Sequence, residues 1–596
     1  MAGGRRCGLI VAGLAGLLAA RASADSSPSP AMLAMRAPIV FTEAQAQQGR
    51  ALFDSACASC HGANLGGGGG RPLKGRTFLG RWAGGSSLGA MFRYVQGRMP
   101  PGGANTLSGE QVTALMALIL KENGFKPGAE AMPADYKALQ AVHLPYTGDT
   151  SGGLAMNAKL PAWPAPANPL DRFTPVTDAM LQSPPPGEWL SWRRTLDGQG
   201  FSPLAQIDRG NVKGLRLAWS YTLAPGPNAA TPLVHDGVLY VYSNRDQVDA
   251  LDARTGDVLW TYRRALPAAG SGLPMRVKRN MALYGDRLYL ATGDNKEIAL
   301  NAKTGEVVWE APTGPASGGP IVVNGTVIEG LFRGERPASA RPLAGAVTCV
   351  TCGGYGRIFG LAAADGAKRW LFNTVPQPGE PGTETWNDIP QEDRSGASVW
   401  TTGYYDPALD LVFIGTGNTY NTGPLAKRVS KRGVSNDALY TDTTLALRPT
   451  TGQLAWHYQH QPNDQWDLDW VYERMILTLP VAGKPVKAVV TAGKMAIIDA
   501  LDAASGRYLF SLDAGLQNVV TRIDPRTGRK TIDPALVPGN GRTATVCPAQ
   551  NGAKNWIPGS FDQGSGMLFL PLNAACMVME PAEPGETSPL SSGIRW

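Results

Sequence analysis

Residues 56–62 read ACASCHG and place Cys57, Cys60 and His61 within five positions of one another. Two thiols at this spacing add to the vinyl groups of haem, and the histidine that follows binds its iron, so the motif predicts a covalently attached c-type haem. One alternative is a thioredoxin-like redox pair, which needs a βαβ context that the sequence does not show. Another is half of a zinc site, which needs further Cys or His ligands. We therefore expect an electron-transfer domain around this motif.

The sixth iron ligand must come from the same domain, which contains Met91, Met99 and Met116. Met99 lies in the loop GRMPPGGANTLSGEQ, whose Pro and Gly residues would hold a thioether rigidly. The other two lie in apolar helical stretches and are expected in the core. Met99 is the expected ligand, and His143 is the alternative. Residues 42–125 resemble class I cytochrome c, which implies a small all-α domain with a methionine ligand in that loop.

The N-terminal residues predict export from the cytoplasm. An Arg-Arg pair at residues 5–6 precedes an apolar run, and residues 22–24 (ASA) offer a cleavage site, so residues 1–24 are expected to be a signal peptide. A retained anchor is the rival interpretation. No later segment is long and apolar enough to span a bilayer, which predicts a periplasmic mature chain without a transmembrane segment. The net charge of +7 includes no basic run, so a nucleic-acid partner is not expected.

Four cysteines lie beyond the signal peptide and the haem motif. In an oxidising compartment they can form two disulfides, with three alternative pairings. Cys349 and Cys352 have the C-x-x-C spacing, but Gly353 follows them, which excludes a second C-x-x-C-H motif. These cysteines are Cys349, Cys352, Cys547 and Cys576.

A linker and a repeated pattern make up the remaining chain. Residues 126–176 are rich in Pro, Ala and Gly and predict an extended connector. Beyond them, an apolar strand, a Gly-containing turn and a second strand ending in an aromatic residue recur, which predicts a propeller of four-stranded blades over residues 177–596. The aromatic residues are expected to pack between blades. They are Trp260, Trp309, Trp370, Trp456 and Phe510, each four residues after Gly256, Gly305, Gly366, Gly452 or Gly506.

These repeats and the motifs after them resemble the PQQ-dependent quinoprotein alcohol dehydrogenases. With the N-terminal cytochrome, the chain is similar to the quinohaemoprotein alcohol dehydrogenases, in an arrangement like that of polyvinyl alcohol dehydrogenases. The resemblance implies a mainly β fold, an eight-bladed-type quinoprotein propeller preceded by the small all-α domain. Eight blades need more chain than residues 189–596 provide, so we expect an incomplete propeller that lacks one or two final blades, with open sheet edges.

The resemblance also implies the residues of an alcohol-oxidising site. Asp467, in HQPNDQWDLDWVYERM, matches the base that takes the hydroxyl proton, and Lys494, in TAGKMAIIDALD, matches the cation at the quinone oxygen. Trp400 matches the indole under the quinone ring, and Asn418 matches an amide that binds the metal. A second carboxylate at Asp469 can point the same way as Asp467 and suits a trivalent ion, so we expect a lanthanide site, with calcium as the alternative.

Further contacts are implied by the same resemblance. Arg279 matches an arginine that binds a cofactor carboxylate, Ser317 a hydroxyl at the ring, and Asn555 an amide that touches the cofactor. Glu335 matches a metal-binding glutamate. The resemblance pairs Cys547 with Cys576 in a disulfide.

Three departures from the family pattern stand out. Leu273 and Pro274 occupy the positions of two adjacent cysteines that commonly cap the quinone. A carboxylate expected near Ala229 is missing. The insertion RPASARPLAGAVTCVTCGG follows Glu335 directly and carries the Cys349–Cys352 pair.

These patterns together predict a periplasmic quinohaemoprotein dehydrogenase that oxidises an alcohol through PQQ and a metal ion. Electrons would pass to haem c and then to a downstream periplasmic cytochrome or respiratory-chain acceptor. The rivals are a non-catalytic propeller scaffold and an electron-transfer cytochrome that no longer binds PQQ. Only the dehydrogenase requires Trp400, Asn418, Asp467 and Lys494 together, and the chain has all four. Small primary, secondary and polymeric alcohols are all candidate substrates.

Overall fold

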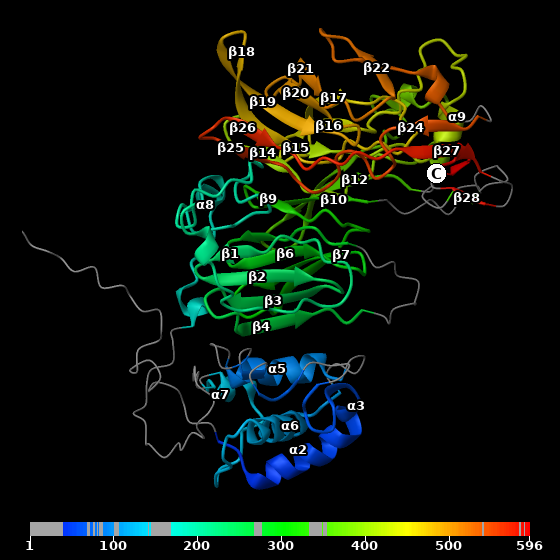
Figure 1. Cartoon of the computed structure of the whole chain (residues 1–596). Coiled ribbons are helices and arrows are strands. Elements are labelled where there is room, and N and C mark those ends of the chain that lie inside the picture. The colour runs from blue at the N-terminus through cyan, green and yellow to red at the C-terminus, as the bar shows by residue number, and fades with distance from the viewer. Residues whose placement is uncertain are drawn as a thin grey trace, which may run out of the picture. The chain divides into compact units, whose positions relative to one another are not determined.

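The computed structural model of the chain forms two compact units, Met1–Ala165 and Pro166–Trp596 (Figure 1). No helix in its described part is both long enough and apolar enough to cross a lipid bilayer. The structure describes residues 40–67, 72–75, 78–79, 82, 87–100, 106–140, 142–144, 168–266, 277–332, 348–349, 354–538, 542–582, 586–588 and 590–595.

The first unit is helical. It contains α2 (Glu43–Ala56), α3 (Ala58–His61), α5 (Leu88–Arg98), α6 (Gly109–Glu122) and α7 (Tyr136–Leu139). Thr42 begins α2 with a capping box, in which its hydroxyl accepts from the Gln45 amide at 3.2 Å and the Gln45 side chain bonds back. Ser108 begins α6 in the same way. Gly49 lets these two helices approach, because a Cβ there would lie 2.0 Å from the Ala114 carbonyl oxygen.

The helices share one apolar core. Met91 and Met116 are 1% and 0% exposed, as expected of core residues. Met132 and Leu139 are buried in the same core. The helical unit therefore includes residues that composition assigns to the connector 126–176, because a few apolar side chains spaced among prolines are enough to dock that segment.

The second unit is built from five four-stranded antiparallel sheets whose strands follow one another in the chain. The first is β1 (Leu233–His235), β2 (Val238–Ser243), β3 (Gln247–Asp252) and β4 (Val258–Arg263), and the second is β5 (Ala282–Tyr284), β6 (Arg287–Ala291), β7 (Lys296–Asn301) and β8 (Val307–Pro312). The third is β9 (Ile321–Val323), β10 (Thr326–Leu331), β12 (Arg357–Ala362) and β13 (Lys368–Asn373). The fourth is β14 (Tyr404–Asp406), β15 (Leu411–Gly415), β16 (Thr443–Leu447) and β17 (Leu454–Gln459), and the fifth is β18 (Met475–Val481), β19 (Lys484–Ala492), β20 (Ile497–Asp502) and β21 (Tyr508–Asp513).

Smaller elements complete this unit. The short sheets pair β11 (Thr348–Cys349) with β28 (Thr587–Ser588), β22 (Val520–Ile523) with β23 (Lys530–Ile532), and β25 (Ser560–Asp562) with β26 (Met567–Phe569). A three-stranded sheet joins β24 (Ala544–Val546), β27 (Met577–Pro581) and β29 (Ile594–Arg595). The short helices are η1 (Pro169–Arg172), α8 (Asp178–Gln182), η2 (Val212–Gly214), η3 (Thr383–Thr385), η4 (Gln391–Asp393), α9 (Thr422–Leu425) and η5 (Pro534–Leu536).

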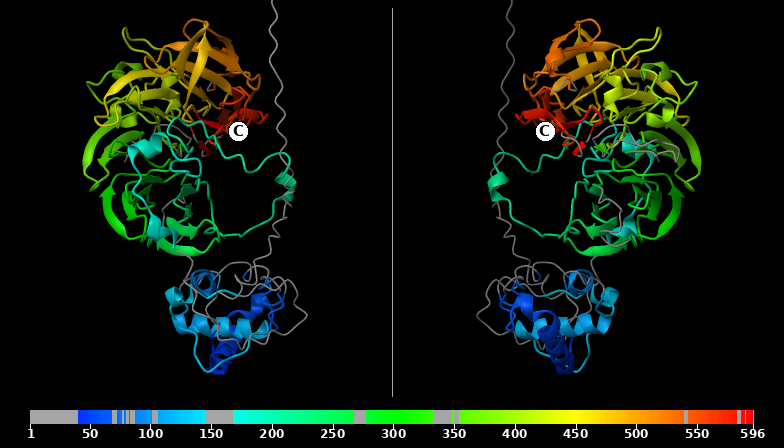
Figure 2. Two further views of the ribbon diagram at one scale, coloured as in Figure 1. Left: turned by 90° about the vertical axis from the view of Figure 1, so that its left-hand side faces the viewer. Right: turned by 90° about the vertical axis from the view of Figure 1, so that its right-hand side faces the viewer.

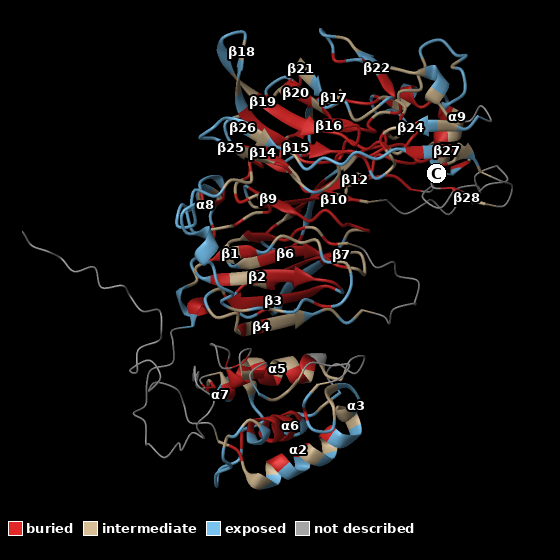
Figure 3. Ribbon diagram, in the orientation of Figure 1, coloured by how far each residue is buried: buried red, intermediate tan, exposed pale blue. Residues whose placement is uncertain are grey.

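The five large sheets follow one another along an arc, and in the described part of the chain this arc does not close into a ring (Figure 2). Most of their inner strands are buried (Figure 3), because each sheet packs its faces against its neighbours. The arrangement confirms the predicted fold class, a mainly β unclosed propeller preceded by a small helical domain.

An indole joins each sheet to the next. Trp309 on β8 donates from Nε1 to the Ala363 carbonyl oxygen at 3.1 Å, and its ring lies against Gly366 in the turn of the following sheet. The sequence repeat places a glycine and an aromatic residue together, but the glycines of the second to fifth sheets each receive the indole of the preceding sheet, and Gly256 of the first sheet receives Trp219, which precedes β1. The five contacts are Trp219–Gly256, Trp260–Gly305, Trp309–Gly366, Trp370–Gly452 and Trp456–Gly506.

Gly366→Ala is expected to lower the free energy of unfolding by about 2–4 kcal/mol, because a Cβ at this φ of +75° would also lie 2.7 Å from the Trp309 ring. Gly325→Ala is the matched control, because its φ is +67° and no atom lies within 4 Å of the added Cβ. Its loss should be about 1–2 kcal/mol. Chemical denaturation measures both, and equal losses would show that indole docking does not stabilise the sheets.

Candidate active site

A buried lysine holds two carboxylates together. Lys494 follows β19, and its Nζ lies 3.0 Å from Asp467 Oδ1 and 2.9 Å from Asp469 Oδ2. Nζ also donates to the Asp467 carbonyl oxygen at 2.7 Å. The backbone amide of Asn418 donates to Asp469 Oδ1 at 2.8 Å. The structure therefore brings four predicted site residues, which come from three separate loops, into one cluster.

The backbone of Asp467 is strained. This residue lies in the irregular segment 460–474 between β17 and β18, and its φ is +65°, which is uncommon for a residue other than glycine. Asp464 fixes the turn by accepting hydrogen bonds from the amides of Trp466, at 2.8 Å, and Leu468, at 2.5 Å. Burial raises the pKa of Asp467 to about 8, although Lys494 opposes the effect. Strain of this kind is often retained where function requires it.

Two further carboxyl groups belong to this cluster. Burial, reinforced by Asp464 and Asp469, raises the pKa of Asp442 well above its usual range. Burial also raises the pKa of Asp464 to about 7. With Asp467 and Asp469 the cluster contains four carboxyl groups, all of which interact with Lys494, while Arg474 interacts with Asp442. The cluster is therefore short of positive charge, and buried acids in that position either keep protons or bind a metal cation.

Arg279 lies between two indoles. Its guanidinium carbon is 4.7 Å from the centroid of the Trp400 ring and 5.5 Å from that of Trp556. Its Nε is buried and has no hydrogen-bond partner within the described residues. Burial lowers the pKa of Arg279 to about 10. Tyr472 packs edge-on against Trp400, with ring centroids 5.4 Å apart. An anion beside Arg279 would accept a hydrogen bond from Nε and would offset the buried positive charge of the guanidinium group.

Gly417 connects this indole pair to the carboxylates. A Cβ at Gly417 would lie 2.6 Å from Asp469 Oδ1 and 3.3 Å from Trp400 Nε1, so a side chain there would displace one of them. Ser317 is 7% exposed, and its carbonyl oxygen accepts from the Arg279 amide at 3.2 Å. Indole, guanidinium and carboxylates therefore form one site.

Asn555 uses both of its amide atoms within its own turn. Nδ2 donates to the Asn551 carbonyl oxygen at 2.6 Å, and Oδ1 accepts from the Trp556 amide at 2.7 Å. The adjacent Lys554 is 1% exposed and pairs with Glu473 at 2.9 Å. In the same turn, the indole of Trp556 lies beside the guanidinium of Arg279.

The predicted disulfide is present. Cys547 and Cys576 are bonded, and they enclose the chain that carries Asn555, as the resemblance implies. Other predicted positions lie outside the described residues. They are residues 1–24, Leu273, Pro274, Glu335 and Cys352.

The haem motif lies where α2 meets α3. The amides of Cys60 and His61 donate to the Cys57 carbonyl oxygen at 3.2 and 2.9 Å, so one helical turn carries all three residues. Cys57 and Met99 both pack, partly buried, against the core of the helical unit. His143, the alternative ligand, lies in an isolated β-bridge after α7. One expected attachment residue, Cys57, and the expected ligand Met99 thus border the same core.

Sequence reasoning missed four residues of the propeller site. Trp556 directly follows the predicted residue Asn555 and, like Trp400, lies outside the repeat. Asp442, Asp464 and Tyr472 carry no such signal, because only the tertiary structure brings their loops to Lys494.

The class of protein follows from this geometry: a propeller with a lysine–carboxylate–indole site, preceded by a helical unit with a haem-attachment motif. Residues 189–515, more than half of the chain, match the PQQ family of the glucose/ethanol/alcohol dehydrogenase β-propeller domain. The chain belongs to this family. Residues 44–119 match the family of subunit III of cbb3-type cytochrome c oxidase.

Several known proteins are similar to this chain. Quinohemoprotein alcohol dehydrogenase ADH IIB of Pseudomonas putida is 36% identical over 409 residues, which are 65% of this chain and 56% of that protein. The solved structure of quinohemoprotein alcohol dehydrogenase ADHIIG of Pseudomonas putida superposes with a TM-score of 0.61 at 30% identity, over 71% of this chain and 63% of that one. A europium-containing methanol dehydrogenase gives a TM-score of 0.59 at 26% identity, over 68% and 72%. The chain spans about half the length of the curated relatives it matches.

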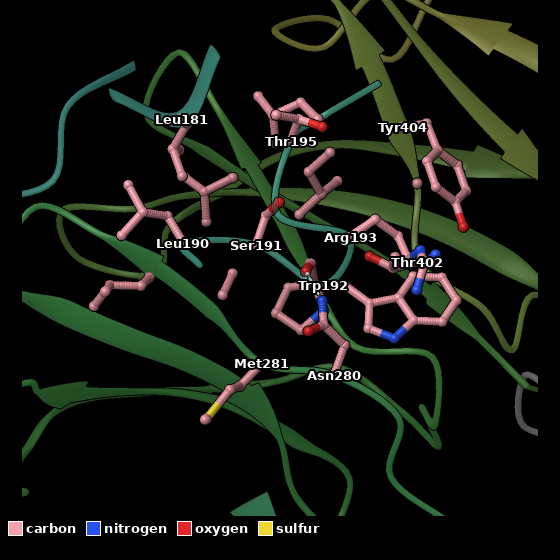
Figure 4. Close-up of a pocket in the computed structure, with 17 residues that line it drawn as sticks. Leu181, Leu190, Ser191, Trp192, Arg193, Thr195, Asn280, Met281, Thr402 and Tyr404 are labelled. Atoms are coloured by element: carbon pink, nitrogen blue, oxygen red, sulfur yellow. Dashed lines mark hydrogen bonds between the residues drawn. The ribbon is translucent and has the colours of Figure 1, made fainter. Parts of the chain in front are cut away.

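A small cavity lies apart from this site (Figure 4). It offers about 20 Å³ to the centres of water molecules and lies between segment 190–196 and strands of the second, third and fourth sheets. Trp192 and Tyr404 line it with ring centroids 6.2 Å apart. None of the predicted site residues lines this cavity, which is a packing gap around the start of the second unit.

A second cluster of metal-ligand types lies at Glu188, His235 and Asp236. Both ring nitrogens of His235 already have partners, since Nδ1 lies 2.8 Å from Glu188 Oε2 and Nε2 lies 2.7 Å from the Thr174 carbonyl oxygen. A carbonyl only accepts, so Nε2 carries a hydrogen, and a charged ring satisfies both bonds. Burial disfavours this charge, but the bonds to Glu188 and Thr174 outweigh burial and raise the pKa of His235. The cluster is therefore an ion pair between a protonated His235 and Glu188, with a hydrogen bond from His235 to the Thr174 carbonyl oxygen.

His235→Gln is expected to flatten the pH dependence of stability. Because the pKa of His235 is raised in the folded protein, its stabilisation is complete below the unfolded-state pKa, about 6.5. It is lost as the pH rises through the higher folded-state value. The free energy of unfolding of the parent should therefore fall between pH 6 and 8 by an amount that the variant lacks, with the variant weaker by about 1–3 kcal/mol at pH 6. If denaturation gives parallel curves of unfolding free energy against pH for parent and variant, His235 is not the charged group inferred here.

Proposed function

We propose that the protein is a PQQ-dependent alcohol dehydrogenase that passes electrons to a covalently bound haem c. The observation that carries this proposal is the approach of Asp469 and Trp400 to the same glycine, Gly417, with Lys494 on one side and Arg279 on the other. The names of the similar proteins ADH IIB and ADHIIG, both quinohemoprotein alcohol dehydrogenases, support the same assignment.

The site fits a planar, anionic quinone such as PQQ. Trp400 offers a flat indole face, and the unpartnered Nε of Arg279 requires an acceptor such as a carboxylate. Ser317 and Asn555 are proposed as further contacts to the cofactor, and Lys494 as the cation at its oxygen. When bound, PQQ supplies the two-electron oxidation that no side chain can perform.

The same residues fit a multivalent cation. Calcium and lanthanide ions prefer oxygen ligands, and Asn418 and Asp469 offer an amide and a carboxylate oxygen in one buried place. Oδ2 of the nearby Asp442 is buried without a partner within the described residues, so it needs either a proton or a nearby cation. We propose these two ligands together with Glu335. The extra carboxylate of Asp469 favours a lanthanide, with calcium as the alternative, and the likeness to a europium-containing methanol dehydrogenase is consistent with that choice.

Asp467 is the proposed base. Its side chain is 23% exposed, compared with 6% for Asp469, so a substrate hydroxyl can reach it. Lys494 stabilises the ionised form of Asp467 at 3.0 Å, and a cation bound at Asp469 would act in the same direction. Asp467 accepts the hydroxyl proton at a carboxylate oxygen, while its hydrogen bond to Lys494 holds that group in place.

The haem residues complete the proposal. Cys57 and Cys60 attach the haem, and His61 and Met99 bind its iron, so that electrons can leave one at a time to a periplasmic cytochrome or a respiratory-chain acceptor. Covalent haem attachment and the disulfide Cys547–Cys576 suit an oxidising compartment, which supports a periplasmic location.

The function is tested on oxidised haem protein mixed with PQQ, a lanthanide or calcium ion, and a primary alcohol. The haem is expected to become reduced, as followed by its absorption spectrum. Asp467→Asn should slow this reduction by about 10²–10⁴-fold, because no base takes the hydroxyl proton. Asp365→Asn, on an exposed turn, is the control and should reduce the haem at the parent rate. No reduction under any combination, in protein whose haem dithionite can reduce, would favour a scaffold or a simple electron carrier.

The identity of the cation is tested at Asp469. In metal-free protein reloaded with a single ion, Asp469→Ala should weaken lanthanide binding by at least roughly tenfold and calcium binding less, because a trivalent ion gains more from each anionic oxygen. Isothermal titration measures the affinities, and haem reduction measures the activity. Equal activity of the variant and the parent with a lanthanide would contradict the lanthanide assignment.

A further inference from the structure

Two buried glutamates meet between neighbouring sheets, away from the carboxylates of the site. Glu297 lies on β7 of the second sheet and is 0% exposed, and Glu329 lies on β10 of the third sheet and is 2% exposed. Their carboxyl groups are within hydrogen-bonding distance of each other. Every residue of β10 is buried, so the pair has no route to solvent along that strand. Acids this deeply buried need hydrogen-bond partners or compensating charge.

The protein supplies few donors to these carboxyl groups. Glu329 Oε1 accepts from the Gly319 amide at 3.0 Å, but Glu329 Oε2 and both oxygens of Glu297 have no partner within the described residues. Tyr242 also interacts electrostatically with both glutamates, but its one hydroxyl hydrogen faces two other acceptors, Asp246 Oδ1 at 3.0 Å and the Ala291 carbonyl oxygen at 2.7 Å. Among the described residues, a proton held between the two carboxyl groups is the donor that remains.

One lysine balances part of the charge. Lys278 is 8% exposed, and its attraction favours the ionised form of both glutamates. Burial outweighs this attraction and raises the pKa of both carboxyl groups. Two carboxylates and one ammonium group leave a buried charge of −1, whereas one retained proton makes the group neutral and supplies the missing donor.

We infer that Glu297 and Glu329 share one proton and, with Lys278, form a neutral buried anchor that positions Arg279 and Ser317. The positioning role of this anchor rests on the proposed function, in which Arg279 and Ser317 contact PQQ. The shared proton does not depend on it.

The anchor is continuous with the segments that carry both contacts. Lys278 Nζ donates to the Ala316 carbonyl oxygen at 3.0 Å. The residues that follow these two are also bonded, because the backbone amide of Arg279 donates to the Ser317 carbonyl oxygen at 3.2 Å. Asn280 Nδ2 continues the series to the Pro320 carbonyl oxygen at 3.1 Å.

Gly319 ties the series to the acid pair. Its amide bonds Glu329, and its φ of +92° with a Cβ position 2.5 Å from the Asn280 carbonyl oxygen admits only glycine. Three consecutive residues on one segment are thus fixed against the other, beside the buried acid pair.

The shared proton is tested by infrared difference spectroscopy on the intact haem protein at neutral pH. Subtracting Glu297→Gln from the parent should leave the C=O stretch of one protonated carboxyl group, because other buried acids, such as Asp442, are common to both and cancel. The Gln amide can donate to Glu329, so the melting temperature should stay close to that of the parent, and Glu329→Gln should behave alike. Lys278→Met should double the band, because the second carboxyl must then also be protonated. An unchanged band in both glutamine variants would overturn the inference.

The positioning role is tested by PQQ binding, followed as quenching of indole fluorescence. Lys278→Met should raise the dissociation constant of PQQ at least tenfold, and Lys303→Met, on an exposed turn, should leave it unchanged. Glu297→Gln should keep near-parent binding, which separates positioning from a general loss of packing. Equal binding by Lys278→Met and Lys303→Met would overturn the positioning role. If the parent itself does not bind PQQ, the proposed function fails, and the infrared result still decides the shared proton.

Discussion

The buried ammonium group of Lys494 is the interaction on which the site depends. It is 5% exposed and contacts two carboxylates and one backbone carbonyl of the segment around Asp467. Without a cation at this point, Asp467 and Asp469 would lie close together with no opposite charge between them, and the segment around Asp467 would lose three contacts. The left-handed backbone of Asp467 is tolerated for the same reason, because its carbonyl and carboxylate oxygens both bind one ammonium group.

The propeller fold makes this meeting of loops possible. Four of the indole–glycine contacts fix one sheet against the next, so the connections between successive strands emerge at set positions. Trp400, Asn418 and Lys494 all lie in such connections, directly before or after a buried strand. Buried carboxylates, which solvent cannot neutralise, lie beside buried lysines. Lys494 has this role at the site, and Lys278 has it at the Glu297–Glu329 pair.

The sequence predicts much of this fold and part of the site. Strand and turn periodicity identifies the sheets, and the motif at Cys57 to His61 identifies the haem attachment, because both depend on residues close together in the chain. The partner of each repeat glycine could not be predicted, since the indole it receives comes from the preceding sheet, as at Trp309 and Gly366. Glu297 and Glu329 would read as solvent-facing acids, because strand patterning does not reveal which charged residues face each other between sheets. Asn555 matches the family pattern and stays a prediction, whereas the neighbouring Trp556 meets Arg279 only through the tertiary structure.

A crystal structure of the haem protein loaded with PQQ and lanthanum would show whether these side chains hold the cofactor and the ion. The account predicts the ring on the face of Trp400, a cofactor carboxylate at Arg279, and the ion, located by its anomalous scattering, at Asn418 and Asp469. Lys494 should keep its contact with Asp467. An ion or ring bound elsewhere, with these side chains unchanged, would contradict the account.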